Sequence, residues 1–296
     1  MYLSHFGLRE LPFGITPDTS YTFETRAHRE AFNTLLIAVK SGEGFIKITG
    51  EVGTGKTLLC RRFLTTLSTQ CVMAYIPNPN LEPRSLMLAL AEELGVVLDQ
   101  NIDQHRLLKG LSQALLDFAA RDLSVVVCLD EAQALPLESL EGLRLLSNLE
   151  TEKRKLLQVV LFGQPELNQK LAARSVRQLR QRITFQYEIK GLGRRETGFY
   201  VAYRLRVAGH VGPQLFSDRT LKALHRRSEG IPRLINILAH KALLAAFGEG
   251  SPVVTPRHLH AAARDCGEAR HWTRRWSPIA WLGAASAAIH THEILR

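Results

Sequence analysis

The chain has 296 residues, of which 45% are hydrophobic and 22% charged, and it carries a formal net charge of +10. This composition is that of an ordinary globular protein, and it excludes a repeat or low-complexity chain. Four cysteines are scattered without C-x-x-C spacing, which indicates buried, reduced thiols and a reducing compartment. The length suits two packed subdomains better than a single core.

The first segment, residues 1–26, mixes aromatic residues with prolines. Because proline interrupts helices, we expect an extended segment that packs on the core rather than a long helix. A helix with apolar periodicity is predicted over 27–40, and a short strand is predicted over 46–49.

That strand leads directly into a glycine-rich loop and then into an apolar-periodic helix that starts at Lys56. Residues 50–57, Gly-Glu-Val-Gly-Thr-Gly-Lys-Thr, match the phosphate-loop (Walker A) pattern G-x-x-x-x-G-K-[ST] in its strand–loop–helix context. Glycines let backbone N–H groups surround a phosphate, and the helix N-terminus adds partial positive charge. We expect Lys56 to reach the β- and γ-phosphates of ATP, and the Thr57 hydroxyl to ligate Mg²⁺.

A strand at 72–76 and helices at about 84–94 and 103–121 precede an apolar strand over 124–129 that ends in Asp130-Glu131. This is the Walker B arrangement, in which Asp130 holds Mg²⁺ through water and Glu131 acts as the general base. An acidic helix cap is the structural alternative. The predicted nucleotide-binding residues are Gly50, Glu51, Val52, Gly53, Thr54, Gly55, Lys56, Thr57, Leu58 and Asp130, and the predicted metal ligands are Thr57 and Asp130.

A helix over 137–150 precedes an apolar strand over 156–162, and Gln164 follows that strand. A polar side chain at this strand end is placed to reach the γ-phosphate. A final strand over 183–189 completes five strands. The sequence therefore predicts an α/β P-loop NTPase core over 27–190 with a five-stranded parallel sheet.

From residue 191 the pattern contains helices only, predicted over 194–208, 217–228, 232–247 and 256–268 with Ser217 and Thr255 as N-caps. This segment, 191–268, is expected to form a small all-helical lid domain. Arg233 lies in the first turn of a predicted helix, where its charge opposes the helix dipole. A nucleotide phosphate would compensate that charge.

The net charge is concentrated in one part of the chain. Residues 170–241 hold 16 Lys and Arg against 4 Asp and Glu. Such a surface favours phosphate, nucleic acid or an anionic membrane as a neighbour. A solvated helical surface is the structural alternative.

Taken together, these motifs resemble the AAA+ ATPases. More narrowly they resemble the ExeA/GspA secretion ATPases and the related MshM-type proteins of type IV (MSHA) pilus biogenesis, and the resemblance covers about residues 1–268. It rests on segments 1–18, 49–57, 130–133, 163–167, 181–183 and 230–236.

The resemblance implies Gln164 as sensor 1, Arg182 (or Arg180) as the arginine finger, and Arg233 as sensor 2. Sensor 1 is more often Asn or Thr in this family, so Gln164 departs from the pattern. The resemblance also implies a homo-oligomer, a ring or dimer, with active sites shared between subunits. Its expected partners are inner-membrane assembly proteins of a pilus or of type II secretion.

The end of the chain, residues 269–296, gathers all three tryptophans within ten positions beside arginines. The apolar run 279–289 is shorter than the about 20 residues that span a bilayer. We expect a cytoplasmic protein whose tail contacts anionic lipid peripherally, with a docked or disordered tail as the alternative. ExeA-type proteins continue into a membrane helix and a periplasmic domain, so the ending fits the shorter MshM-type form.

Three functions compete: an ATPase that serves secretion or pilus assembly, a nucleic-acid-associated ATPase such as a transposition helper, and a switch that binds ATP without turnover. We rank them in that order, because Glu131 is intact and no nucleic-acid-binding motif stands out. The pairs His258/His260 and His290/His292 resemble metal ligands only superficially, and we expect them to face solvent.

Overall fold

The computed structural model describes residues 2–14, 21, 23–97, 102–149 and 155–266. The chain divides into two compact units, the α/β unit of Glu24–Gly191 and a helical unit that joins Met1–Phe23 to the chain from Leu192 onward. The predicted membrane-contacting tail, 269–296, lies outside the described residues. None of the helices in the described part of the chain has the length and apolar character that crossing a membrane requires.

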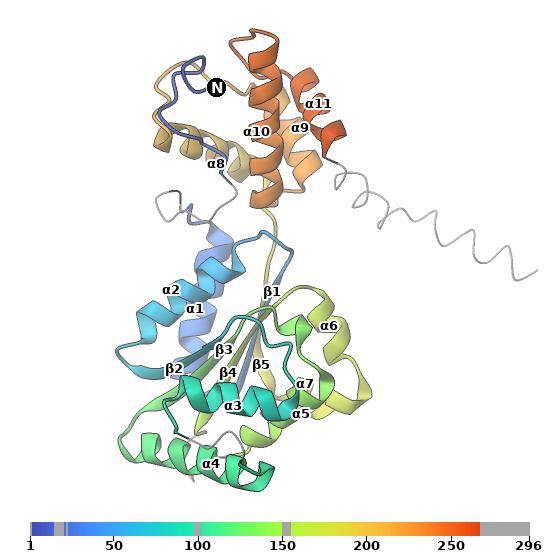
Figure 1. The fold of residues 1–296 in the computed structure, drawn as a ribbon. Coiled ribbons are helices and arrows are strands. Elements are labelled where there is room, and N and C mark those ends of the chain that lie inside the picture. The colour runs from blue at the N-terminus through green and yellow to red at the C-terminus, as the bar shows by residue number, and fades with distance from the viewer. Residues whose placement is uncertain (1, 15–20, 22, 98–101, 150–154, 267–296) are drawn as a thin grey trace, which may run out of the picture. The chain divides into compact units, whose positions relative to one another are not determined.

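The α/β unit is built on a parallel sheet of five strands in the order β2-β3-β4-β1-β5 (Figure 1). The predicted α/β fold class with five parallel strands is therefore confirmed. The strands are β1 (Phe45–Gly50), β2 (Cys71–Ile76), β3 (Ser124–Leu129), β4 (Leu157–Gly163) and β5 (Ile183–Ile189).

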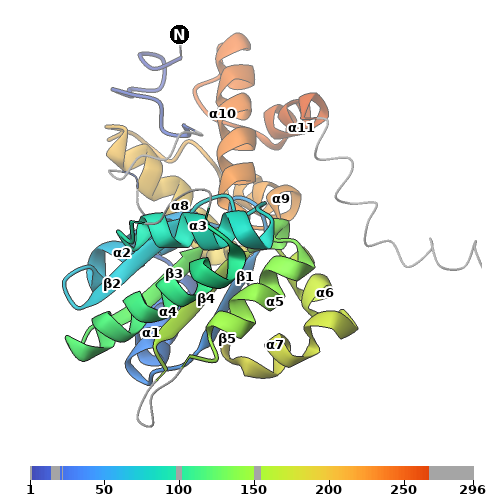
Figure 2. The same cartoon turned by 60° about the horizontal axis from the view of Figure 1, so that its bottom comes forward.

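Helices cover both faces of this sheet, as Figure 2 shows. One face packs against α1 (Arg26–Lys40) and α2 (Lys56–Leu67) through side chains such as Ile48 and Cys128. The other packs against the remaining helices through alternating side chains such as Val127 and Leu161. Those helices are α3 (Pro83–Glu93), α4 (Gln104–Ala120), α5 (Leu137–Leu146), α6 (Glu166–Leu171) and α7 (Arg177–Arg182). Because side chains alternate along a strand, apolar runs on β3 and β4 supply both layers.

The helical unit contains α8 (Arg194–Val207), α9 (Asp218–Ser228), α10 (Pro232–Gly248) and α11 (Pro256–Asp265). Ser217 caps α9, since its hydroxyl accepts from the Thr220 N–H. Gly230 adopts φ +74°, and a Cβ there would lie 2.1 Å from the Leu192 carbonyl oxygen. Only glycine therefore fits the turn that leads into α10.

The N-terminal segment belongs to the helical unit, which corrects our expectation that it packs on the α/β core. Tyr2, Phe6 and Phe13 are buried in the same apolar cluster as α8–α11. The buried Arg204 of α8 donates to the Pro12 carbonyl at 2.6 Å and to the Tyr200 hydroxyl at 2.9 Å. The pattern of aromatics and prolines indicated burial but not which core would supply it.

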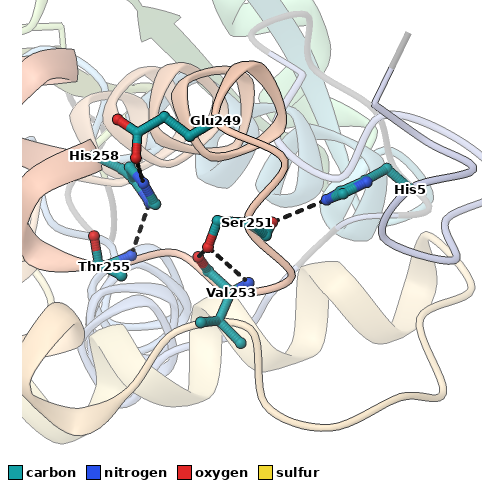
Figure 3. Close-up of polar contacts among 6 residues, drawn as sticks. All are labelled: His5, Glu249, Ser251, Val253, Thr255 and His258. Atoms are coloured by element: carbon teal, nitrogen blue, oxygen red, sulfur yellow. Dashed lines mark hydrogen bonds and ion pairs between the residues drawn. The ribbon is translucent and has the colours of Figure 1, made fainter.

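His258 corrects the expectation that the histidine pair on α11 faces solvent. Its side chain is 2% exposed, and its Nε2 lies 2.8 Å from Glu249 Oε2 (Figure 3). Its Nδ1 accepts from the Thr255 N–H at 3.0 Å, so His258 and Thr255 together form a capping box at the start of α11. Residues two apart on a helix point in different directions, and His260 is exposed.

Candidate functional site

The phosphate loop connects β1 to α2 at the carboxyl edge of the sheet. Gly53 and Gly55 adopt φ values of +82° and +93°, a region that favours glycine. A Cβ at Gly55 would also lie 2.8 Å from Nε2 of His28, and a Cβ at Gly50 would lie 2.8 Å from the Ile189 carbonyl oxygen. Both conformation and space therefore require glycines here, which leaves the backbone accessible to a phosphate.

His28, from the first turns of α1, supports this loop. Its Nε2 lies 2.8 Å from the Thr54 carbonyl oxygen, and its Nδ1 lies 2.7 Å from the Thr25 hydroxyl. A carbonyl only accepts, so Nε2 carries the proton in this contact. The imidazole thereby holds the loop at Thr54, one residue before Gly55, which is the N-cap of α2.

Lys56 is the buried cation of the site, with 4% of its surface exposed. Its ammonium donates to the carbonyl oxygens of Gly50 at 2.8 Å and Glu51 at 3.0 Å. Burial lowers the pKa of Lys56, and the carboxylates of Glu131 and Asp130 oppose that effect. An ammonium group has three donors, so a third remains to meet an anionic ligand.

Asp130, at the end of β3, lies beside the first turn of α2. The Thr57 hydroxyl donates to its Oδ2 at 2.7 Å, and the Glu131 N–H donates to its Oδ1 at 3.0 Å. Burial raises the pKa of Asp130, while these two hydrogen bonds lower it. Mg²⁺ prefers oxygen ligands and is commonly held by one or two carboxylates with water. The adjacent Thr57 and Asp130 oxygens fit that requirement.

Glu131 takes a left-handed conformation with φ +52° that sets the direction of its side chain. Its Oε2 accepts from Gln133 Nε2 at 2.5 Å and from Gln164 Nε2 at 2.9 Å. β4 lies directly between β3 and β1 in the sheet. The structure therefore brings the predicted residues of the phosphate loop, the end of β3 and the end of β4 to one edge.

The predicted arginines are not part of this cluster. Arg182 precedes β5, whose first residue pairs with Phe45 at the amino end of β1. The length of β1, about 17 Å at 3.3 Å per residue, separates that end from the phosphate loop. Arg182 Nη1 instead donates to the Ser147 hydroxyl at 3.3 Å, whereas Arg180 is exposed on α7. Arg233 is exposed in the first turn of α10, in the helical unit.

Sequence reasoning missed His28, Gln133 and Lys170. Lys170, on α6, donates from Nζ to the carbonyl oxygens of Gln133 and Leu135 at 2.5 Å each. Each of the three makes at least one contact with a residue more than 25 positions away, which no local pattern predicts. The Asp130-Glu131-Ala-Gln133 sequence was the one available signal.

Comparisons with known proteins agree with this geometry. Residues 39–171 match the family model described as an AAA domain. The fold is that of an AAA P-loop NTPase. The chain is 44% identical over 263 residues, 89% of its length, to General secretion pathway protein A of Aeromonas hydrophila. It spans about half of that relative, 48%.

Solved structures of similar fold share much less sequence. Cdc6p of Pyrobaculum aerophilum superimposes with a TM-score of 0.61 at 16% identity, over 84% of this chain and 71% of that one. RuvB of Thermotoga maritima, a Holliday junction branch migration motor, superimposes with 0.53 at 15% identity, over 86% and 73%. At such identities these likenesses establish the fold alone. The AAA domain match supports ATPase activity in general terms.

Proposed function

We propose that this chain binds ATP with Mg²⁺ and hydrolyses it. One observation carries the proposal: a glycine loop, a buried lysine and a hydroxyl–carboxylate pair converge at one sheet edge, with Thr57 Oγ1 2.7 Å from Asp130 Oδ2. When bound, Mg²⁺ would supply positive charge that offsets the charge of the phosphates. Thr57 and Asp130 would hold it.

The residues divide the work by chemistry. The loop N–H groups and the N-terminus of α2 bind the phosphates, and Lys56 neutralises charge that develops on them. Glu131 accepts the proton of the attacking water, and Gln164 orients the groups around it. Asp130 stays ionised beside the cation.

The active site is shared between subunits of a ring or dimer. Because Arg182 lies at the opposite end of β1 from the phosphate loop, it acts on the nucleotide of a neighbouring subunit rather than its own. Arg233 is proposed as a ligand of a nucleotide phosphate, because its charge opposes the dipole of α10.

The name of the Aeromonas hydrophila relative places that protein in general secretion, which supports a proposal for the pathway of this chain. We propose that this chain drives type II secretion assembly from the cytoplasmic side of the inner membrane, where it is peripheral. The MshM-type role in type IV pilus assembly is the variant within this proposal. A nucleic-acid-associated role ranks second, and the 16 Lys and Arg against 4 Asp and Glu over 170–241 favour it.

Glu131→Gln tests the hydrolytic role. The amide cannot accept a proton, so ATP turnover should fall by about 10²–10⁴-fold while ATP and Mg²⁺ still bind. Glu138→Gln, an exposed carboxylate on α5, is the matched control and should hydrolyse ATP like the parent. Normal turnover in Glu131→Gln would remove Glu131 as the base. Absence of ATP binding by the parent chain would end the proposal.

A further inference from the structure

Gln133 connects the candidate base to the end of a different strand. It lies in the short turn Ala132–Ala134 after β3, and both ends of its side-chain amide have partners. Nε2 donates to Glu131 Oε2 at 2.5 Å, and Oε1 accepts from the Gln164 N–H at 2.9 Å. Turning the amide over would bring oxygen to oxygen and N–H to N–H, so these contacts fix its orientation.

The Gln164 side chain completes a closed ring of hydrogen bonds. Its Nε2 donates to the same Glu131 oxygen, Oε2, at 2.9 Å. Both amides therefore bind one oxygen of the carboxylate. Within the described residues, no hydrogen bond to Oε1 of Glu131 is present, so this second oxygen is available to a water molecule.

We propose that Gln133 is a positioning residue, which anchors Oε2 of Glu131 so that Oε1 faces the attacking water. This inference rests on the proposed hydrolysis of ATP. In this role Gln133 acts through Glu131, to which its amide donates. Two amide donors on one oxygen remove the rotation that a lone carboxylate would keep, and alignment of a base contributes strongly to its rate effect.

Two neighbours hold Gln133 itself in place. Lys170 Nζ donates to the Gln133 and Leu135 carbonyl oxygens, which fixes the turn on which Gln133 lies. Gly163 leaves room for the side chain, since a Cβ there would lie 3.3 Å from Gln133 Oε1 and 2.8 Å from Leu167 Cδ2. The turn and the end of β4 thus form a prepared support for the amide.

The test compares Gln133→Leu and Gln133→Asn with the parent in steady-state ATP hydrolysis and ATP binding. Leucine keeps the volume and removes both hydrogen bonds, while asparagine keeps the amide but is one methylene too short. Each should lower kcat by about 10- to 100-fold, with the Kd for ATP within about twofold. Gln113→Leu is the matched control, because Gln113 also donates its amide to a carboxylate, Asp117, on the exposed face of α4. It should leave kcat unchanged.

A double variant separates positioning from a general structural role. In the Glu131→Gln background, adding Gln133→Leu should cause no further loss of single-turnover hydrolysis, because the group it positions is absent. A further loss of about tenfold or more would show that Gln133 acts elsewhere and would overturn the inference. So would a normal kcat in Gln133→Leu or, if that variant fails to bind ATP, in Gln133→Asn. A parent chain that does not hydrolyse ATP would instead refute the proposed function.

Discussion

Both units of this molecule bury polar side chains. In the α/β unit burial disfavours the charged forms of these groups, whereas in the helical unit the buried groups hold the unit together. In the α/β unit the buried charges are Lys56 and Asp130, and burial disfavours the charged form of each, lowering one pKa and raising the other. In the helical unit Arg204 and His258 are buried among partners that satisfy them, including a carbonyl, a hydroxyl and a carboxylate.

The difference separates a site prepared for a ligand from a structural anchor. Burial makes the charged forms of Lys56 and Asp130 less favourable, and bound phosphate and Mg²⁺ would offset that cost. Arg204 instead connects α8 to Pro12, which lies 192 positions earlier in the chain. Its hydrogen bonds therefore stabilise the helical unit itself. Burial of a charge alone therefore does not identify a functional site; the position of Lys56 and Asp130 at the phosphate loop and the end of β3 does the distinguishing.

Lys56→Ala should have the largest effect. Loss of the only ammonium in the phosphate loop should weaken ATP binding by about 100-fold or more, since charge-assisted contacts of this kind are worth about 3 kcal/mol. The fold should persist, because truncation removes a desolvated charge. Fluorescent-ATP titration measures the affinity, with Lys40→Ala, exposed at the end of α1, as control. Unchanged affinity would mean that the site lies elsewhere.

The same variant sharpens the shared-site proposal. Arg182→Ala should bind ATP but hydrolyse it poorly. Mixed with Lys56→Ala, it should recover part of the activity, because each variant supplies the half-site that the other lacks. If ATP hydrolysis does not recover in confirmed hetero-oligomers, Arg182 has no role in a neighbour's site and serves only its structural contact with Ser147.

Arg204→Met should have the next largest effect, which is a loss of stability of the helical unit. It removes the donors to Pro12 and Tyr200 and the guanidinium 4.5 Å from the Tyr21 ring centroid. We expect the helical unit to lose about 2–4 kcal/mol. Amide hydrogen exchange of α8–α11 reports this directly, because two units need not unfold together. Arg206→Met, exposed on the same helix, should exchange like the parent.

Asp130→Asn should have the smallest effect on stability, and it should stabilise the protein rather than destabilise it. Removing a charge that burial disfavours should raise the stability of the ligand-free protein by about 1 kcal/mol, a few degrees in Tm, while abolishing hydrolysis. Thermal unfolding without nucleotide or Mg²⁺ measures it, with exposed Asp117→Asn as control. Equal or lower stability of Asp130→Asn would contradict the comparison between the units.

The pH dependence of the stability difference between Asp130→Asn and the parent follows from the direction in which the pKa of Asp130 is shifted. The folded pKa of Asp130 is raised, so the folded state binds its proton more tightly than the unfolded chain does. Its ionisation therefore costs stability above the raised pKa, and the cost disappears as the pH falls toward the ordinary value of 3.8. Asp130→Asn should exceed the parent in stability at neutral pH and match it at strongly acidic pH.

Much of the α/β unit could be predicted from local sequence. β3 and β5 occupy the predicted residues, 124–129 and 183–189. β3 is an apolar run and β5 alternates apolar with polar residues, and both patterns are characteristic of strands. The six-residue helices α6 and α7 were missed, since neither is long enough to show periodicity. The phosphate loop was predictable because its pattern is contiguous.

Contacts between distant residues could not be predicted in this way. Gln133 meets Gln164 only because β3 and β4 are neighbours in the sheet, and no local pattern encodes that pairing. His258 was expected to face solvent because no further metal ligands lie nearby in sequence, yet Glu249 and the start of α11 give it partners inside. The burial of a polar residue depends on the partners that the fold supplies.

The composition of the helical unit also has a consequence for synthesis of the chain. Met1–Phe23 is translated before the α/β unit, whereas the helices that bury it follow Leu192. At about 5–20 residues per second, the ribosome needs roughly 10–30 s to make the intervening α/β unit. Tyr2, Phe6 and Phe13 therefore leave the ribosome long before their partners exist, and they remain exposed to chaperones while the α/β unit folds. Tyr2, Phe6 and Phe13 thus reach their final environment only after the α/β unit has been synthesised.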